Sequence, residues 1–145
     1  MSRRKGRILA FQGVYSWDVS QSSVEDILNF SWLQKDSESE EKEQTPAPEA
    51  LEEKTFASLI ITGTIEHVAE IDELIKNHLT ASWTLERINK VSLAILRTSI
   101  FEMKFQNGSE PKIVIDEAVN IAREYGLEDS YKFINAVLDK IGKEV

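Results

Sequence analysis

Four basic side chains stand close together at the start of the chain. No acid separates them within the first seven residues, and they occupy positions Arg3, Arg4, Lys5 and Arg7. On a helix this cluster spans about one and a half turns and could neutralise about four phosphates. For a single-stranded nucleic acid, that number predicts a slope of about −3 when log affinity is plotted against log salt concentration. The cluster therefore indicates nucleic-acid binding, with a solvated helix end as the plainer alternative.

Aromatic side chains could add base recognition to this electrostatic contact. Unpaired RNA bases commonly stack on aromatic rings. The rings suited to that role by their place in the sequence are Tyr15, Trp17, Tyr131 and Phe133. For each ring taken alone, packing in a hydrophobic core is the ordinary role.

The residue patterns of common enzymes and metal sites are missing from the sequence. The two histidines, His67 and His78, lie eleven residues apart, which is about 16 Å along a helix and too far to bind one metal ion. No glycine-rich phosphate loop and no GxSxG nucleophile motif occurs. The sequence therefore predicts no catalytic residues, no metal site and no cofactor.

The net charge of −8 argues at first sight against a nucleic-acid partner, but the charge is unevenly distributed. Residues 36–53 hold eight acids and one base, a net charge of −7, which leaves about −1 for the rest of the chain. Residues 34–49 are also rich in Ser, Gln and Pro, and we expect them to form an acidic, flexible loop. The average charge therefore does not describe the surroundings of the N-terminus.

Composition also limits which cellular compartment and which domain organisation the protein can have. The chain has no cysteine, which excludes disulfides and favours a reducing cytoplasm. No apolar run approaches the roughly 20 residues of a membrane span, and the N-terminus lacks the apolar stretch of a signal peptide. With 145 residues, of which 41% are hydrophobic, we expect one compact cytoplasmic domain, residues 1–145, without membrane contact.

Helical periodicity places the basic cluster on the first of several helices. In segment 3–17 the apolar residues Ile8, Phe11 and Tyr15 form one buried stripe. Gly6 lies inside the basic cluster, where it costs up to ~1 kcal/mol relative to Ala. We therefore expect the first turn to fray and to become ordered only when RNA binds.

The rest of the chain shows the same period. No segment alternates as a strand does, and further helices are predicted over 23–33, 50–79 and 111–126, with one or two helices over 83–105. A final helix follows residue 126. Ser23 is expected to cap the helix over 23–33, and Asp129 or Ser130 to cap the final one. Gly63, inside 50–79, marks either a kink or a close helix crossing. The fold class predicted is all-α, with two packed helical bundles of about seven helices in one compact chain.

Several stretches, taken in this order, resemble the NusB family. They are 3–7 (RRKGR), 10–18 (AFQGVYSWD), 63–75, 83–88 (WTLERI), 95–97 (ILR), 101–103 (FEM), 115–119 (IDEAV) and 125–141 (YGLEDSYKFINAVLDKI). The likeness covers nearly the whole chain except 34–53. Each stretch alone is a soft match, but their order and spacing make the resemblance specific.

The resemblance implies a bacterial RNA-binding transcription antitermination factor. The family binds the boxA element of nascent ribosomal RNA transcripts together with NusE, a small-subunit ribosomal protein, and then joins NusA, NusG and RNA polymerase. Some members form homodimers. By position, the implied RNA-binding residues are Arg3, Arg4, Lys5, Arg7, Gln12, Tyr15, Asp129, Lys132 and Phe133. The implied NusE-facing residues are Val91, Ser92, Arg97 and Glu102.

Two departures and two alternatives accompany this hypothesis. Gly6 stands where the family usually has Ala, and Ser92 where it commonly places an acid facing NusE. One alternative function is a helical protein-interaction adaptor that does not bind RNA. The other is an accessory domain of an rRNA methyltransferase, although no methyl-donor site is recognisable in the chain. If the basic cluster binds RNA directly, changing Arg3, Arg4 and Arg7 to Ala should weaken binding without lowering the melting temperature.

Overall fold

The computed structural model describes residues 2–33, 48–80, 82–106 and 109–144, and these ranges contain helices but no strand. The α-helices are α1 (Arg3–Ser20), α2 (Val24–Leu28), α3 (Pro48–Glu66), α4 (Val68–Asn77), α5 (Lys90–Ile100), α6 (Pro111–Tyr125) and α7 (Ser130–Gly142). A 3-10 turn, η2 (Leu85–Arg87), precedes α5, and a π-helical turn, η3 (Phe101–Phe105), follows it. The predicted all-α class is confirmed.

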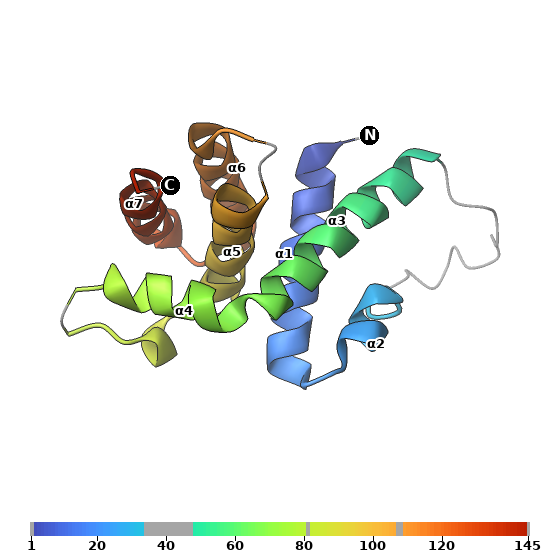
Figure 1. Cartoon of the computed structure of the whole chain (residues 1–145), viewed down its shortest axis with the longest axis horizontal. Helices are drawn as coiled ribbons and strands as arrows, with labels where there is room; N and C mark the ends of the chain where they lie inside the picture. The colour runs from blue at the N-terminus through green and yellow to red at the C-terminus, as the bar shows by residue number, and fades with distance from the viewer. Residues whose placement is uncertain (1, 34–47, 81, 107–108, 145) are drawn as a thin grey trace.

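The helices form two groups that share the long first helix. Helix α1 lies in the middle of the molecule and packs against α2 and α3 on one side and against α5 on the other (Figure 1). Helices α6 and α7 pack against each other and against α5, while α4 runs across the lower end of α5. Because α1 contacts both α3 and α5, it joins the two groups.

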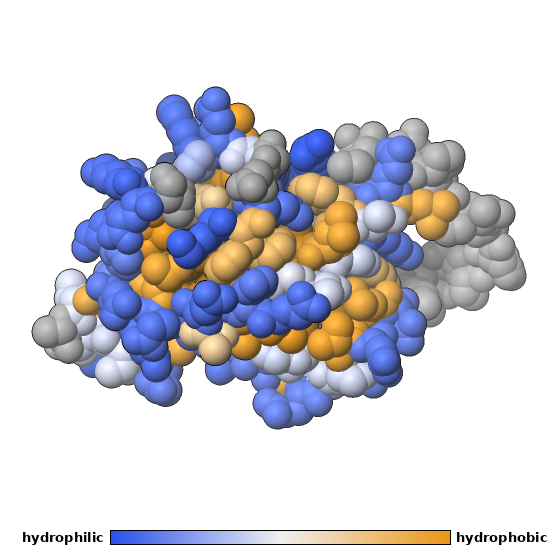
Figure 2. Space-filling view, in the orientation of Figure 1, coloured by the Kyte–Doolittle hydropathy of each residue, from blue (hydrophilic) through white to orange (hydrophobic). Residues whose placement is uncertain are grey.

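One hydrophobic core runs through both groups. Helices α1, α3, α5 and α7 each contribute fully buried side chains, for example Val14, Ile61, Leu96 and Ile134. Burying each such side chain contributes about 1.5–3 kcal/mol to folding. On the face shown in Figure 2, apolar side chains gather over the middle of the molecule and hydrophilic ones surround them. No helix in the described ranges is both long and apolar enough to cross a membrane.

The segment predicted as one helix over 50–79 is two helices. Helix α3 begins at Pro48, two residues earlier than expected, and ends at Glu66; the rest of the expected acidic loop, 34–47, lies outside the described residues. The break falls at His67, whose φ of −107° and ψ of 16° depart from helical values. Gly63 is instead a close helix crossing, because a Cβ there would lie 2.1 Å from Cζ of Phe101.

The predicted end of the helix over 23–33 and the predicted cap of the final helix also need correction. The helix expected over 23–33 ends at Leu28, although Ser23 caps it as expected by accepting a 3.1 Å hydrogen bond from the Asp26 amide. At the start of α7, Asp129 occupies the N-cap position with a φ of 68°, and its side chain makes no capping hydrogen bond. The Ser130 hydroxyl donates to the Leu127 carbonyl at 2.8 Å instead. The left-handed turn therefore begins α7 without the side-chain cap that the sequence suggested.

The first turn of α1 is ordered without RNA, contrary to the expectation that it frays. The Ser2 hydroxyl accepts a hydrogen bond from the Lys5 amide at 3.1 Å, and the Ser2 amide donates to Glu53 Oε2 of α3 at 3.0 Å. Gly6 is buried against α3, where a Cβ would lie 2.4 Å from the Phe56 ring. The glycine therefore allows α1 and α3 to approach closely, and this packing offsets its low helix propensity.

Candidate nucleic-acid interface

The outward side of α1 carries a mixed polar and aromatic surface. Lys5 is exposed, Gln12 is half-buried and Tyr15 has 36% of its surface exposed. The helical repeat places these three residues on one side of α1, over a length of about 15 Å. The structure thus brings together a cation, an amide and a phenol ring. Tyr15, expected in a buried stripe with Ile8 and Phe11, is instead exposed in the structure, whereas Phe11 is buried.

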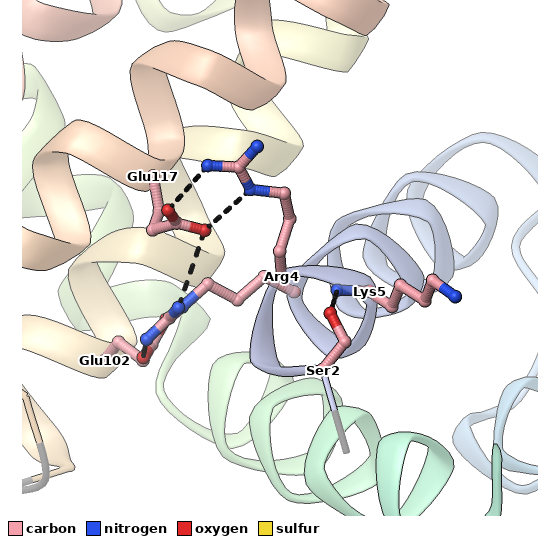
Figure 3. Close-up of polar contacts among 6 residues, drawn as sticks. Ser2, Arg4, Lys5, Glu102 and Glu117 are labelled. Atoms are coloured by element: carbon pink, nitrogen blue, oxygen red, sulfur yellow. Dashed lines mark hydrogen bonds and ion pairs between the residues drawn. The ribbon is translucent and has the colours of Figure 1, made fainter. Parts of the chain in front are cut away.

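Arg4 lies beside this surface, but a carboxylate of α6 already holds its side chain. Its Nε and Nη2 atoms donate to the two carboxylate oxygens of Glu117 at 3.1 and 2.9 Å (Figure 3). The hydrogen bond and charge of Glu117 raise the pKa of Arg4, and the hydrogen bond from Arg4 lowers the pKa of Glu117. Arg4 is therefore exposed yet neutralised in this conformation.

Arg7 faces the interior. It is 8% exposed and donates from Nε and Nη2 to Glu102 of η3, both at 2.8 Å, and Glu102 is itself 4% exposed. Its Nη1 lies 3.8 Å from Glu117. Burial lowers the pKa of Arg7, but the hydrogen bond and charge of Glu102 outweigh it and leave the pKa raised. A direct contact between Arg7 and an RNA phosphate would require breaking this buried pair.

The remaining two cations of the cluster are exposed. Arg3 lies over the ring of Phe56, 5.4 Å from its centre. Within the part of the chain that the structure describes, Lys5 and Arg3 make no ion pair. Two available cations in place of four reduce the expected salt slope for single-stranded RNA from about −3 to about −1.4.

The C-terminal candidates lie at the start of α7. Lys132 and Asp129 are both exposed and face each other at 3.7 Å. The half-buried Phe133 meets Trp83 edge to face, with ring centres 6.2 Å apart. An open groove of about 320 Å³ lies between the start of α7 and the start of α5. Its lining includes Phe133, Ser92 and Asp129. These residues form a second surface, distinct from the side of α1.

Helix α6 lies between the two surfaces. Glu117 contacts Arg4 near the start of α1, and Tyr125 contacts Phe11 farther along it, with ring centres 5.6 Å apart. The two helices therefore run side by side in the same direction, and Glu117 and Tyr125 are about 12 Å apart along α6. The start of α7 follows Tyr125, so Lys132 lies near the Tyr125 end of α6, whereas Arg4 lies beside Glu117.

Three of the four candidate NusE-facing residues lie in the interior. Ser92 is 1% exposed, and Arg97, 7% exposed, donates to both carboxylate oxygens of Asp72 at 2.9 and 2.8 Å. Glu102 is the buried partner of Arg7, and Val91 is half-buried. Direct partner contact at these positions stays a prediction, and the structure shows what three of them do within the fold.

Sequence reasoning missed several neighbours of the candidate residues. Glu117 and Asp72 hold arginines that the sequence suggested for binding. Arg123 of α6 lies over the ring of Tyr131 at 4.5 Å, and Tyr125 is 41% exposed. No local sequence signal identifies these contacts, because each joins residues from different helices.

The histidines serve packing and helix ends. His67 stacks on Phe105, with ring centres 4.1 Å apart, and the His78 ring lies 2.8 Å from both the Leu74 carbonyl and Glu144. No group of three or more potential metal-binding side chains occurs among the described residues.

The fold and these surfaces define an all-α protein whose first helix joins two helical groups and presents a cation, an amide and an aromatic ring on its outer side. The family model of the NusB family matches residues 4–143. The chain belongs to the NusB family.

Curated relatives and solved structures agree with this assignment. The chain is 43% identical over 141 residues to the transcription antitermination protein NusB of Treponema denticola, covering 97% of this chain and 96% of the relative. For the protein of the same name from Borreliella burgdorferi, identity is 41%, over 96% of this chain and 92% of the relative.

Among solved structures, T. maritima NusB matches with a TM-score of 0.80 and 30% identity, covering 99% of this chain and 92% of that one. A chain from a crystal structure of the antitermination factors NusB and NusE in complex with dsRNA matches with a TM-score of 0.77 and 26% identity, over 99% of this chain and 97% of that one.

Proposed function

We propose that this protein is an RNA-binding transcription antitermination factor that binds boxA RNA of nascent ribosomal RNA transcripts together with NusE. The observation that carries the proposal is the outer side of α1, where Lys5, Gln12 and Tyr15 lie together in a member of the NusB family. The related structure that contains NusB, NusE and dsRNA supports the choice of partners.

The proposed mechanism is binding and positioning, without a catalytic step or a cofactor. Lys5 and Arg3 attract phosphates, which fixes the RNA on the protein without reading its sequence. Tyr15 stacks on an unpaired base, and the Gln12 amide can donate to and accept from a base edge. Lys132 and Phe133 extend the contact along the second surface toward the start of α5.

In this proposal NusE binds beside α5, where the half-buried Val91 is the accessible member of the predicted set. The complex of protein, NusE and RNA would then join NusA, NusG and RNA polymerase. Some members of the family form homodimers, and a homodimer of this chain that masked the RNA surface would compete with RNA binding.

The test is a fluorescence anisotropy titration of labelled boxA RNA and of a scrambled RNA, with and without NusE. We expect weak boxA binding by the protein alone and tighter binding with NusE, and the same factor must appear in the affinity for NusE when RNA is present. Tyr15→Ala should weaken boxA binding by about 5- to 150-fold, because base stacking contributes about 1–3 kcal/mol. Tyr15→Phe, which keeps the ring, is the matched control.

Two outcomes would contradict the proposal. Equal affinity for boxA with and without NusE would show that RNA and NusE do not bind cooperatively. Binding of NusE without any RNA binding would favour the protein-interaction adaptor instead.

A further inference from the structure

Two arginines of α1 share two carboxylates from other parts of the fold, and the pairs differ in exposure. The buried pair is Arg7 with Glu102, whose side chains are 9% and 5% exposed. The outer pair is Arg4 with Glu117, at 50% and 20%. Figure 3 shows the Glu117 carboxylate facing the guanidinium of Arg4. Nη1 of Arg7 lies 3.8 Å from the same carboxylate. Glu117 is therefore the accessible member of the network's two carboxylates.

The contact between Arg4 and Glu117 uses the edge of the guanidinium that a phosphate would use. Arginine binds phosphates and carboxylates alike through a fork of two parallel N–H groups. In Arg4 the fork formed by Nε and Nη2 is occupied by Glu117. A phosphate must therefore displace the carboxylate, or bind at the remaining edge beside a negative charge.

Displacement is feasible in this geometry. The Arg4 side chain is half exposed, so it can turn toward solvent without opening the core. When it leaves, Glu117 keeps a positive neighbour, because Nη1 of Arg7 lies 3.8 Å away. The carboxylate is thus not left buried without a partner, and the first turn of α1 stays fixed by the buried pair below it.

We propose that Glu117 is a positioning residue that competes with RNA phosphate for Arg4 and so lowers the sequence-independent part of RNA binding. The inference rests on the proposed RNA-binding function and adds an acidic residue to it. Phosphate contacts raise affinity for every RNA, whereas base contacts distinguish one RNA from another. Withholding one cation therefore weakens binding to unrelated RNA and leaves discrimination to the base-contacting side chains of α1.

The experiment compares the unmodified protein with Glu117→Gln, using single-stranded boxA RNA and a scrambled RNA of equal length at salt concentrations from about 50 to about 200 mM. One more phosphate contact should steepen the log–log salt slope by about 0.7 and tighten scrambled-RNA binding about 5-fold near 0.1 M salt. Asp116→Asn, the neighbouring exposed acid that faces Lys112, removes the same charge away from Arg4 and should change both quantities little.

A double-mutant cycle separates action through Arg4 from a general charge effect. In an Arg4→Ala background, Glu117→Gln should leave both the affinity and the slope unchanged. An unchanged slope in the single variant, or an equal gain in the Arg4→Ala background, would overturn the inference. Absence of RNA binding by the unmodified protein would instead refute the proposed function, so the two failures are distinguishable.

A second measurement follows the Arg4 Nε–H resonance in both proteins. In Glu117→Gln the resonance should shift when scrambled RNA is added, because the freed guanidinium binds phosphate. In the unmodified protein it should shift less, because Glu117 competes for the same edge of the guanidinium. The resonance of Arg7, which stays paired with Glu102, should shift little in either protein. Equal shifts of the Arg4 resonance in the two proteins would also overturn the inference.

Discussion

Replacing Arg7 by Ala should destabilise the protein strongly, although the residue belongs to a basic cluster that the sequence assigns to RNA. The substitution removes two 2.8 Å hydrogen bonds to Glu102 and leaves that carboxylate 4% exposed without its partner. Removing one member of a buried ion pair costs about 3–5 kcal/mol. This loss is a large part of the free energy of unfolding, which is roughly 5–15 kcal/mol for a native domain.

Urea unfolding followed by far-ultraviolet circular dichroism measures this loss directly, and a thermal scan gives a second value. At about 3 °C per kcal/mol for a chain of this size, we expect the melting temperature to fall by about 9–15 °C. Arg4→Ala is the matched control. It removes the same side chain one turn earlier on α1, but from a half-exposed position, so the unfolding midpoint should stay close to that of the unmodified protein.

A paired substitution shows whether the uncompensated charge is the cause. Changing Arg7 to Met and Glu102 to Leu together removes both charges, and replacement of a buried pair by apolar side chains is often neutral or stabilising. The double variant should therefore recover much of the stability lost in Arg7→Ala. A loss below about 1 kcal/mol in Arg7→Ala would refute the reasoning, because a pair with so little effect cannot hold Arg7 in the interior.

Two further substitutions test the packing and the pH dependence. Gly63→Ala places a Cβ 2.1 Å from the buried Phe101 ring and should lower the free energy of unfolding by about 1–3 kcal/mol in urea, whereas unchanged stability would mean that the helices can separate freely. The hydrogen bonds of His78 to the Leu74 carbonyl and then to Glu144 raise its pKa above 6.5, so the stability they supply is complete below 6.5 and is lost as pH rises through the folded-state pKa. Glu144→Gln should therefore lower the melting temperature by about 1–3 °C near pH 5.5 and by less near pH 8.5, and an equal effect at both pH values would contradict this.

The helices could be predicted from the sequence because the spacing of apolar residues and the positions of turn residues are local signals. The break between α3 and α4 could not, since neither Gly nor Pro stands at His67. Its ring stacks on Phe105, and α4 packs across α5, so tertiary contacts fix the break. Gly63, one turn earlier, did indicate a feature of the fold, but that feature is the close crossing of α3 with η3 and not the break.

The cationic side chains of the candidate site could be identified from the sequence, but their availability could not. Glu117 stands 113 residues from Arg4 and Glu102 stands 95 residues from Arg7, so no local pattern links them. The same holds for Arg97, whose partner Asp72 lies 25 residues earlier on another helix. A basic residue therefore says little about binding until the acids that the fold places beside it are known.

The structure gives the two sides of α1 different tasks. The inner side is fixed, because Gly6 packs against α3 and Arg7 is bound to η3. The outer side keeps Lys5 and Tyr15 accessible on a helix whose first turn is already capped. A rigid surface loses less conformational entropy when its ligand binds. Affinity for RNA in this protein should therefore depend less on the number of cations than on their fixed arrangement and on the partner that extends the surface.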